Sequence, residues 1–245
     1  MNEKIKYSKG SLILPVRIDE FLYENFDNHY SVFYKRKGAS LLNELCDKYG
    51  SDKGEIQKTG HPYSWPSHTY ADFLERQFGP FRTFVKTVFE CGLGSKNPSI
   101  SSNMTASGKP GASLRVWRDY FPFAQVYGAD IDKDALFNES RISTFHCDQT
   151  SSESIAKLWA DIGDIQFDLM IDDGLHTFEA GVSLFVNSIH KLRDGGVYII
   201  EDVIPSSLVS FAEFFTSKNY NYEFINLFRK DLRLGDNSLI VIRKF

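Results

Sequence analysis

Residues 167–176, FDLMIDDGLH, join a short apolar run to two acids and a histidine. The apolar run is typical of a buried strand, and an acidic pair directly after it is costly to bury without a cation or hydrogen-bond donors. Residues 197–202, VYIIED, repeat this arrangement with Glu201 and Asp202. In an open α/β sheet, ligands bind at the carboxyl ends of the strands. The two segments therefore predict a metal site or an acid–base site at such an edge.

Strand-like and helix-like segments alternate through most of the chain. Apolar runs typical of strands cover residues 84–90, 125–130, 141–147, 166–172 and 196–201. Helix-like segments cover residues 39–48, 67–78, 112–120, 133–138, 151–161, 177–191 and 206–217. From residue 84 onward this alternation is typical of βαβ units around a parallel sheet. The tail, residues 221–245, predicts a hairpin at the sheet edge with its turn at residues 235–237.

The bulk composition excludes several classes of protein. A net charge of -4 argues against nucleic acid as the main partner. No apolar run reaches the length of a membrane span. The three cysteines have no metal-ligand spacing, so we expect buried free thiols and a cytoplasmic location. Residues 1–36 show no clear period, and we expect them to form an extension that packs on the main domain.

A glycine turn follows the first predicted strand, in residues 90–94, ECGLG. Glycines at this position let a ligand approach the backbone closely. Asp130 ends the next strand, where a carboxylate can accept both hydrogen bonds of a ribose diol. The alternative is that Asp130 or Asp132 only caps the following helix, and Asp132 is better placed to do so.

The glycine turn departs from the dinucleotide fingerprint. The third glycine position of that fingerprint is Asn97, and the long polar loop 95–111 precedes the next helix. A pyrophosphate would therefore find no helix N-terminus beside the turn. This favours a nucleoside cofactor without a pyrophosphate, such as S-adenosylmethionine, over NAD. Asp148 and Gln149 follow the third strand and could bind the adenine edge, or Asp148 or Thr150 could cap the next helix.

The acidic edge predicts a metal site. Neighbouring strands lie about 5 Å apart, so Asp173, Glu201 and Asp202 can converge on one ion. Such ligands suit Mg²⁺, Mn²⁺ or Ca²⁺. Any one of these acids could instead be a helix cap, but acids on adjacent strand ends repel one another without a cation. His176 is the candidate general base, because its ordinary pKa suits proton abstraction near neutral pH. For His61 and His68 we favour surface packing over substrate contact.

Taken together, these residues resemble the class I S-adenosylmethionine-dependent methyltransferases. More narrowly, they are similar to the metal-dependent sugar O-methyltransferases of macrolide biosynthesis and their relatives in bacterial surface-polysaccharide pathways. The matching segments are YGSDK (49–53), HTY (68–70), ECGLG (90–94), GASLRVW (111–117), YGADID (127–132), CDQ (147–149), IDDGLH (171–176) and GGVYIIED (195–202). Two departures, Leu175 in place of the usual serine and the long loop 95–111, leave the acceptor open.

The resemblance implies a Rossmann-like α/β sheet, mostly parallel, with an antiparallel C-terminal hairpin strand and helices on both faces. It implies an N-terminal segment, residues 1–66, that covers the cofactor and acceptor, and a methyltransferase domain in residues 67–245. It implies Mg²⁺ bound by Asp173, Glu201 and Asp202, with His176 and Asp173 as catalytic residues. The implied cofactor-binding residues are Ser51, Lys53, Tyr70, Glu90, Gly92, Gly94, Asp130, Asp148, Gln149 and Asp172.

The predicted function is methyl transfer from S-adenosylmethionine to a hydroxyl of a sugar or glycoconjugate. The expected partner is a small molecule or glycan, and proteins of this kind often form homo-oligomers. One alternative is an amine or phosphate-linked acceptor, for which the metal is dispensable. A second is a non-catalytic nucleotide-sugar-binding protein of the same fold, and an NAD-dependent oxidoreductase ranks last.

Overall fold

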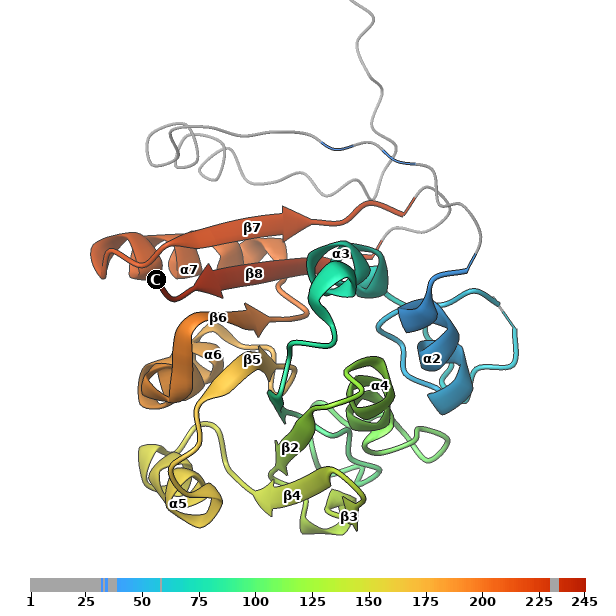
Figure 1. Cartoon of the computed structure of the whole chain (residues 1–245), viewed down its shortest axis with the longest axis horizontal. Helices are drawn as coiled ribbons and strands as arrows, with labels where there is room; N and C mark the ends of the chain where they lie inside the picture. The colour runs from blue at the N-terminus through green and yellow to red at the C-terminus, as the bar shows by residue number, and fades with distance from the viewer. Residues whose placement is uncertain (1–31, 33, 35–38, 58, 230–233) are drawn as a thin grey trace, which may run out of the picture.

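One mixed sheet of eight strands forms the centre of the computed structural model, which describes residues 32, 34, 39–57, 59–229 and 234–245 (Figure 1). The strand order is β3-β4-β2-β1-β5-β6-β8-β7. The bounds are β1 (Thr87–Cys91), β2 (Gln125–Asp130), β3 (Asn138–Glu139), β4 (Ile142–His146), β5 (Phe167–Asp172), β6 (Leu192–Ile200), β7 (Tyr222–Asn226) and β8 (Ser238–Arg243). Strands β4, β2, β1, β5 and β6 are parallel, whereas β8 is antiparallel to both β6 and β7. The predicted fold class, including the C-terminal hairpin, is confirmed.

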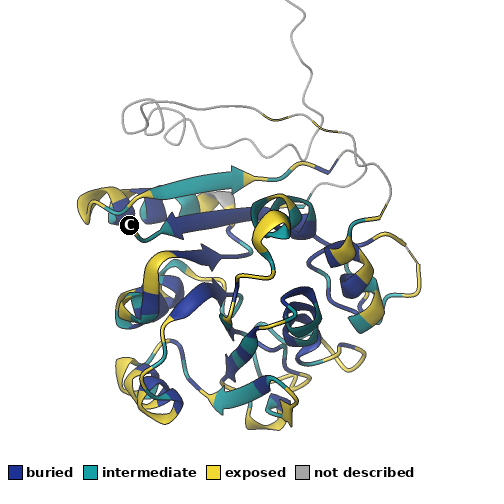
Figure 2. Ribbon diagram, in the orientation of Figure 1, coloured by how far each residue is buried: buried dark blue, intermediate teal, exposed yellow. Residues whose placement is uncertain are grey.

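Helices cover both faces of this sheet. Their bounds are α2 (Leu41–Tyr49), α3 (Tyr70–Phe78), α4 (Ala112–Tyr120), α5 (Ser152–Ile162), α6 (Phe178–Ser188) and α7 (Pro205–Ser217). Successive strand residues point to opposite faces, so Val88 packs in the core under α2, α3 and α4, while Phe89 packs in the core under α5, α6 and α7. Figure 2 shows the central strands buried and the outer surfaces of α5 and α6 exposed.

Local sequence signals set the ends of several helices. Ser40 caps α2 by accepting a hydrogen bond from the Asn43 amide, and Gly50 ends it in the left-handed region at a φ of 75°. Ser151 and Thr177 cap α5 and α6 in the same way as Ser40. The cap of α5 is therefore neither Asp148 nor Thr150, the two residues considered from the sequence.

The segment predicted as a helix over 133–138 is different in the structure. Only a 3-10 turn forms, at Lys133–Ala135, and the short strand β3 follows it and pairs with β4. Asp132 does cap this turn, through a hydrogen bond from the Asp134 amide. The side chain of Asn138, the first residue of β3, accepts a hydrogen bond from the Thr144 amide of β4.

The extension predicted over residues 1–36 lies almost entirely outside the described residues. The division of the chain into two parts at residue 66 stays a prediction. Within the described part, Leu42 and Leu45 of α2 share a core with Leu114 of α4. Among these residues, no helix is both long enough and apolar enough to cross a membrane.

Candidate active site

A cavity of about 460 Å³ lies at the carboxyl ends of the parallel strands. Most of the predicted site residues line it, although they come from segments far apart in the sequence. They are Ser51, Lys53, Tyr70, Gly92, Gly94, Asp130, Asp148, Gln149, Asp173, His176, Glu201 and Asp202. Two predicted cofactor-binding residues, Glu90 and Asp172, are buried beside the cavity and do not line it.

The turn after β1 needs glycine because another segment of the chain packs directly against its backbone. Gly92 has a φ of 96°, and a Cβ atom there would lie 2.0 Å from the carbonyl oxygen of Asp173. The Asp173 amide donates to the Cys91 carbonyl, which holds the two loops together. A Cβ atom on Gly94 would collide with the side chain of Met104, from the long loop 95–111. The glycines therefore let three segments meet at the cavity floor.

Asp130 is fixed at the cavity wall by backbone donors. Its carboxylate accepts hydrogen bonds from the amides of Leu93, at 2.7 Å, and Asp132, at 2.8 Å. Burial raises the pKa of Asp130, and these amides oppose the shift. The capping role falls to Asp132, which leaves Asp130 facing the cavity, where its predicted contact with a ribose stays a prediction.

The side chain of Gln149 is committed to the protein. Its Nε2 donates to Asp172, at 3.1 Å, and its Oε1 accepts from the Leu175 amide, at 2.8 Å. These contacts hold the loop that carries His176. Asp148 accepts from the backbone amide and the hydroxyl of Thr150. Burial raises the pKa of Asp172 to about 6.

The expectation that no helix N-terminus lies beside the glycine turn is wrong. The Gly111 amide donates to the Leu93 carbonyl, at 2.7 Å, so the long loop returns and places the start of α4 against the turn. Ala112 and Ser113 of its first turn line the cavity. The Ser113 hydroxyl donates to Glu90, at 2.6 Å. The argument against a pyrophosphate therefore does not hold on this ground.

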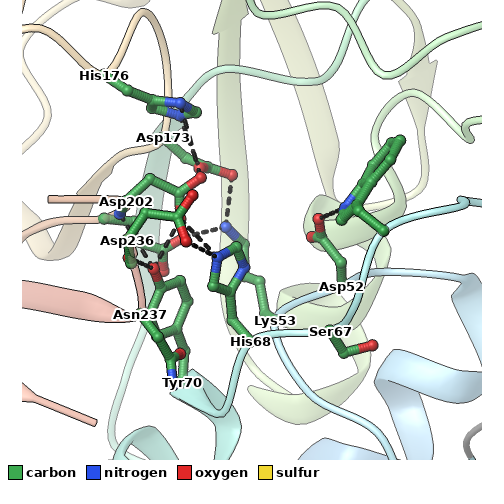
Figure 3. Close-up of polar contacts among 12 residues, drawn as sticks. Asp52, Lys53, Ser67, His68, Tyr70, Asp173, His176, Asp202, Asp236 and Asn237 are labelled. Carbon is green, nitrogen blue, oxygen red and sulfur yellow. Dashed lines mark hydrogen bonds and ion pairs between the residues drawn. The ribbon is translucent and has the colours of Figure 1, made fainter. Parts of the chain in front are cut away.

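Lys53 lies at the centre of a buried group of carboxylates. Its ammonium is 2.6 Å from Asp173 Oδ2 (Figure 3). It also donates a hydrogen bond to Glu201 Oε2 and lies 3.5 Å from Glu90 Oε1. Burial alone would lower the pKa of Lys53, but the three carboxylates hold it well above its usual value. Lys53 is thus a charged residue whose side chain faces the acidic edge.

Asp173, His176 and Asp202 lie together next to Lys53. His176 Nε2 is 3.3 Å from Asp173 Oδ1, and His176 Nδ1 is 3.6 Å from Asp202 Oδ2. Burial disfavours the charged imidazole, yet the hydrogen bond to Asp173 and the charge of Asp202 raise the pKa of His176 to about 10. His176 and Asp202 also have positive φ values of 59° and 54°, a backbone strain that is common at functional sites.

This group fits a divalent cation. One ligand atom from each of Asp173, His176 and Asp202 lies within 4.8 Å of the others. Glu201, the third predicted ligand, faces Lys53 with Oε2, while its Oε1 is buried without a hydrogen-bond partner among the described residues. Carboxylate oxygens of this kind suit Mg²⁺ or Mn²⁺.

Sequence reasoning missed a second polar layer behind Asp202. His68 is buried, against the expectation of surface packing, and its Nε2 lies 3.5 Å from Asp202 and 3.3 Å from Asp236 (Figure 3). The Tyr70 hydroxyl is 2.7 Å from both Asp202 Oδ1 and the Asp236 carbonyl oxygen. Asn237 donates to Thr69 Oγ1 and accepts from the Thr69 amide. The hairpin turn therefore forms part of the site, and its only sequence signal was a cluster of turn residues.

Comparison with known proteins places this geometry among methyltransferases. The chain is 35% identical over 165 residues to the 8-demethyl-8-alpha-L-rhamnosyl tetracenomycin-C 2'-O-methyltransferase of Streptomyces olivaceus, a match covering 67% of this chain and 38% of that protein. It is 31% identical over 159 residues to the mycinamicin VI 2''-O-methyltransferase of Micromonospora griseorubida, covering 63% and 37%. Over the matched region the chain is therefore similar in sequence to sugar O-methyltransferases. No protein-family model matches it.

Solved structures agree with these sequence relatives. The MycE methyltransferase from the mycinamycin biosynthetic pathway, in complex with Mg and SAH, superposes with a TM-score of 0.59 and 25% identity over 85% of this chain and 55% of that chain. The chain therefore has the fold of the class I methyltransferases, and the predicted resemblance is confirmed. The chain spans less than half the length of these two curated relatives.

Proposed function

We propose that this chain transfers a methyl group from S-adenosylmethionine to a hydroxyl of a sugar on a natural product, with the help of Mg²⁺. The observation that carries the proposal is the cavity itself. One wall is a glycine turn with Asp130 at the next strand end, and the other is an edge of Asp173, His176 and Asp202. The two relatives named above are sugar O-methyltransferases of natural products, which supports this acceptor class over a polysaccharide.

The cofactor would lie along the glycine turn. Asp130 would accept hydrogen bonds from the ribose, and Asp148 would bind the adenine. Ser51 and Tyr70, which line the opposite side of the cavity, would exclude water from the reacting atoms. Holding the acceptor oxygen in line with the methyl carbon and sulfur is the main contribution of the protein to such a displacement.

His176 would take the proton of the acceptor hydroxyl. Asp173 and Asp202 would hold Mg²⁺ with Glu201, a buried carboxylate whose Oε1 has no hydrogen-bond partner among the described residues. When bound, Mg²⁺ lowers the pKa of a hydroxyl and offsets the negative charge that otherwise keeps His176 protonated. Asp173, beside Nε2, and Asp202, beside Nδ1, also fix the orientation of the His176 imidazole.

The first test is calorimetry with S-adenosylhomocysteine and with NADH, each with and without Mg²⁺. We expect the chain to bind S-adenosylhomocysteine with micromolar affinity and not to bind NADH. Binding of S-adenosylhomocysteine should be lost in Asp130→Ala and retained in Asp132→Ala, which removes a neighbouring acid with a capping role. Binding of NADH instead, or of neither compound, would overturn the cofactor assignment.

The second test measures methyl transfer to glycosides with free hydroxyls, with and without a chelator. Loss of activity with the chelator, restored by Mg²⁺, supports the metal-assisted reaction. Full activity with the chelator would favour an amine or phosphate-linked acceptor. Binding of sugar nucleotides without any methyl transfer would favour the non-catalytic alternative. The homo-oligomer, the cytoplasmic location and the absence of a nucleic-acid partner stay predictions.

A further inference from the structure

Lys53 is the one lysine among the described residues whose side chain is almost completely buried beside several carboxylates. Its side chain is 3% exposed, and those of Glu90 and Glu201 are fully buried. Charges in such an environment remain only where an opposite charge compensates for lost hydration. The ammonium of Lys53 is therefore the resident counter-charge of this part of the site.

Two of the three carboxylates that bind Lys53, those of Asp173 and Glu201, are also candidate metal ligands. Asp173 Oδ2 and Glu201 Oε2 both face the ammonium. An ammonium binds carboxylates through hydrogen bonds, whereas Mg²⁺ binds their oxygens directly at about 2.1 Å. A cation held by Asp173 and Glu201 must therefore compete with Lys53 for the same negative charge.

We propose that Lys53 is a built-in competitor of the divalent cation. In the metal-free chain it neutralises Glu201 and Asp173, and it loses part of this contact when the cation binds. This inference rests on the proposed metal site and adds to it an internal residue that sets metal affinity. It also links the metal to the cofactor cavity, because the segment from Gly50 to Lys53 lines that cavity.

Two tryptophans are positioned to report such a change. Trp65 Nε1 donates to Asp52, the residue before Lys53, at 2.5 Å. Trp117 Nε1 donates to Glu90, which is itself an ion-pair partner of Lys53. Trp159 donates to Asn187 and Ser188 in the core on the other face of the sheet. It serves as an internal control.

The first experiment records the indole N–H signals of ¹⁵N-labelled full-length protein during titration with MgCl₂, against NaCl of equal ionic strength. We expect the signals of Trp65 and Trp117 to shift with Mg²⁺, while that of Trp159 stays in place. Mg²⁺ binding by calorimetry that leaves the signals of both Trp65 and Trp117 unchanged would overturn the proposal.

The second experiment measures Mg²⁺ affinity of Lys53→Met by calorimetry. We expect binding about tenfold tighter or more, because removing one nearby positive charge strengthens the attraction of a cation. Lys48→Met is the matched control, since this exposed lysine pairs with Asp119 away from the cavity, and its affinity should equal that of the unmodified chain. Equal or weaker binding in Lys53→Met would overturn the proposal.

A charge-balanced variant covers the case in which Lys53→Met fails to fold. Lys53→Met combined with Glu90→Gln removes one cation and one anion, and it leaves all proposed metal ligands in place. It should also bind Mg²⁺ more tightly than Glu90→Gln alone, and equal affinity would overturn the proposal. If the unmodified chain binds no Mg²⁺ at all, the metal in the proposed function fails together with this inference. If it binds Mg²⁺ but the lysine variants bind no tighter, only the inference fails.

Discussion

The two halves of the cavity are assembled in different ways. On the cofactor side, at the ends of β2 and β4, Asp130 and Asp148 each accept a hydrogen bond from the amide two residues on, at Asp132 and Thr150, and Asp130 also accepts one from the distant Leu93 amide. On the acidic side, at the ends of β5 and β6, the partners come from distant segments. Lys53 binds Asp173 and Glu201, and Asp236 binds His68. The sequence therefore indicates the local contacts of the first half, but not the distant partners that complete either half.

The largest effect should come from His176→Ala, which tests whether the two halves work separately. We expect turnover to fall by roughly 10²- to 10⁴-fold, the usual contribution of a general base. Affinity for S-adenosylhomocysteine should change little, since His176 contacts only the acidic side. The measurements are steady-state turnover and calorimetry. His190→Ala, an exposed histidine away from the cavity, is the control, and unchanged turnover in His176→Ala would remove the base assignment.

Gly92→Ala should disrupt the contact between the glycine turn and the Asp173 loop, which connects the two halves of the cavity. The added Cβ atom would lie 2.0 Å from the Asp173 carbonyl, at a φ of 96°. We expect a loss of about 3 kcal/mol in the free energy of unfolding, together with weaker binding of both cofactor and Mg²⁺. Urea denaturation and calorimetry measure these quantities.

Gly163→Ala is the matched control, because Gly163 has a similar φ of 90° and no atom within 4 Å of an added Cβ. It should cost about 1 kcal/mol, the backbone strain alone. Equal losses in the two variants would mean that contact between the loops does not determine the need for glycine at position 92.

Asn237→Ala should weaken the acidic side while sparing the cofactor side. The buried amide bonds Thr69 twice and the Leu227 carbonyl once. Its loss leaves buried backbone groups without partners, at a cost of about 2 kcal/mol in the free energy of unfolding. We expect lower Mg²⁺ affinity with S-adenosylhomocysteine affinity retained. Asn226→Ala is the control, because this exposed residue lies opposite Ser238 at the same end of the hairpin and does not bond Thr69 or Leu227 through its side chain. If Asn237→Ala lowers both affinities equally, the two sides are not separate.

The fold was predictable because its signals are local. Strand ends at Asp130 and Asp172 were placed correctly from apolar runs and the acids that follow them. The short strand β3 was missed, because two residues carry no period. The positions of Asp236 and Asn237 depend on pairing. Since β8 runs antiparallel to β6, its first residue lies beside the carboxyl end of β6, and the turn before it reaches the site. Neither the composition nor the hydrophobic periodicity of the sequence predicts which residues of β6 and β8 pair.

The smallest expected effect is the part of the pH dependence of stability that His68 contributes. Burial disfavours the charge on His68, but the hydrogen bond to Asp236 and the charge of Asp202 raise its pKa to about 9, above the ordinary 6.5. The folded state therefore binds the proton more tightly than the unfolded state. The resulting stabilisation is full below pH 6.5, declines as the pH rises, and is lost above about 9.

We expect this stabilisation to be about 1–2 kcal/mol in the unmodified chain. The slope of the free energy of unfolding against pH should be smaller in His68→Gln, as measured by urea denaturation from pH 6 to 9.5. The exposed His190 provides the control through His190→Gln, which should keep the slope. An identical slope in His68→Gln would mean that the pair with Asp236 contributes no stability, and that the hairpin turn is held to the site by Asn237 and Tyr70 instead.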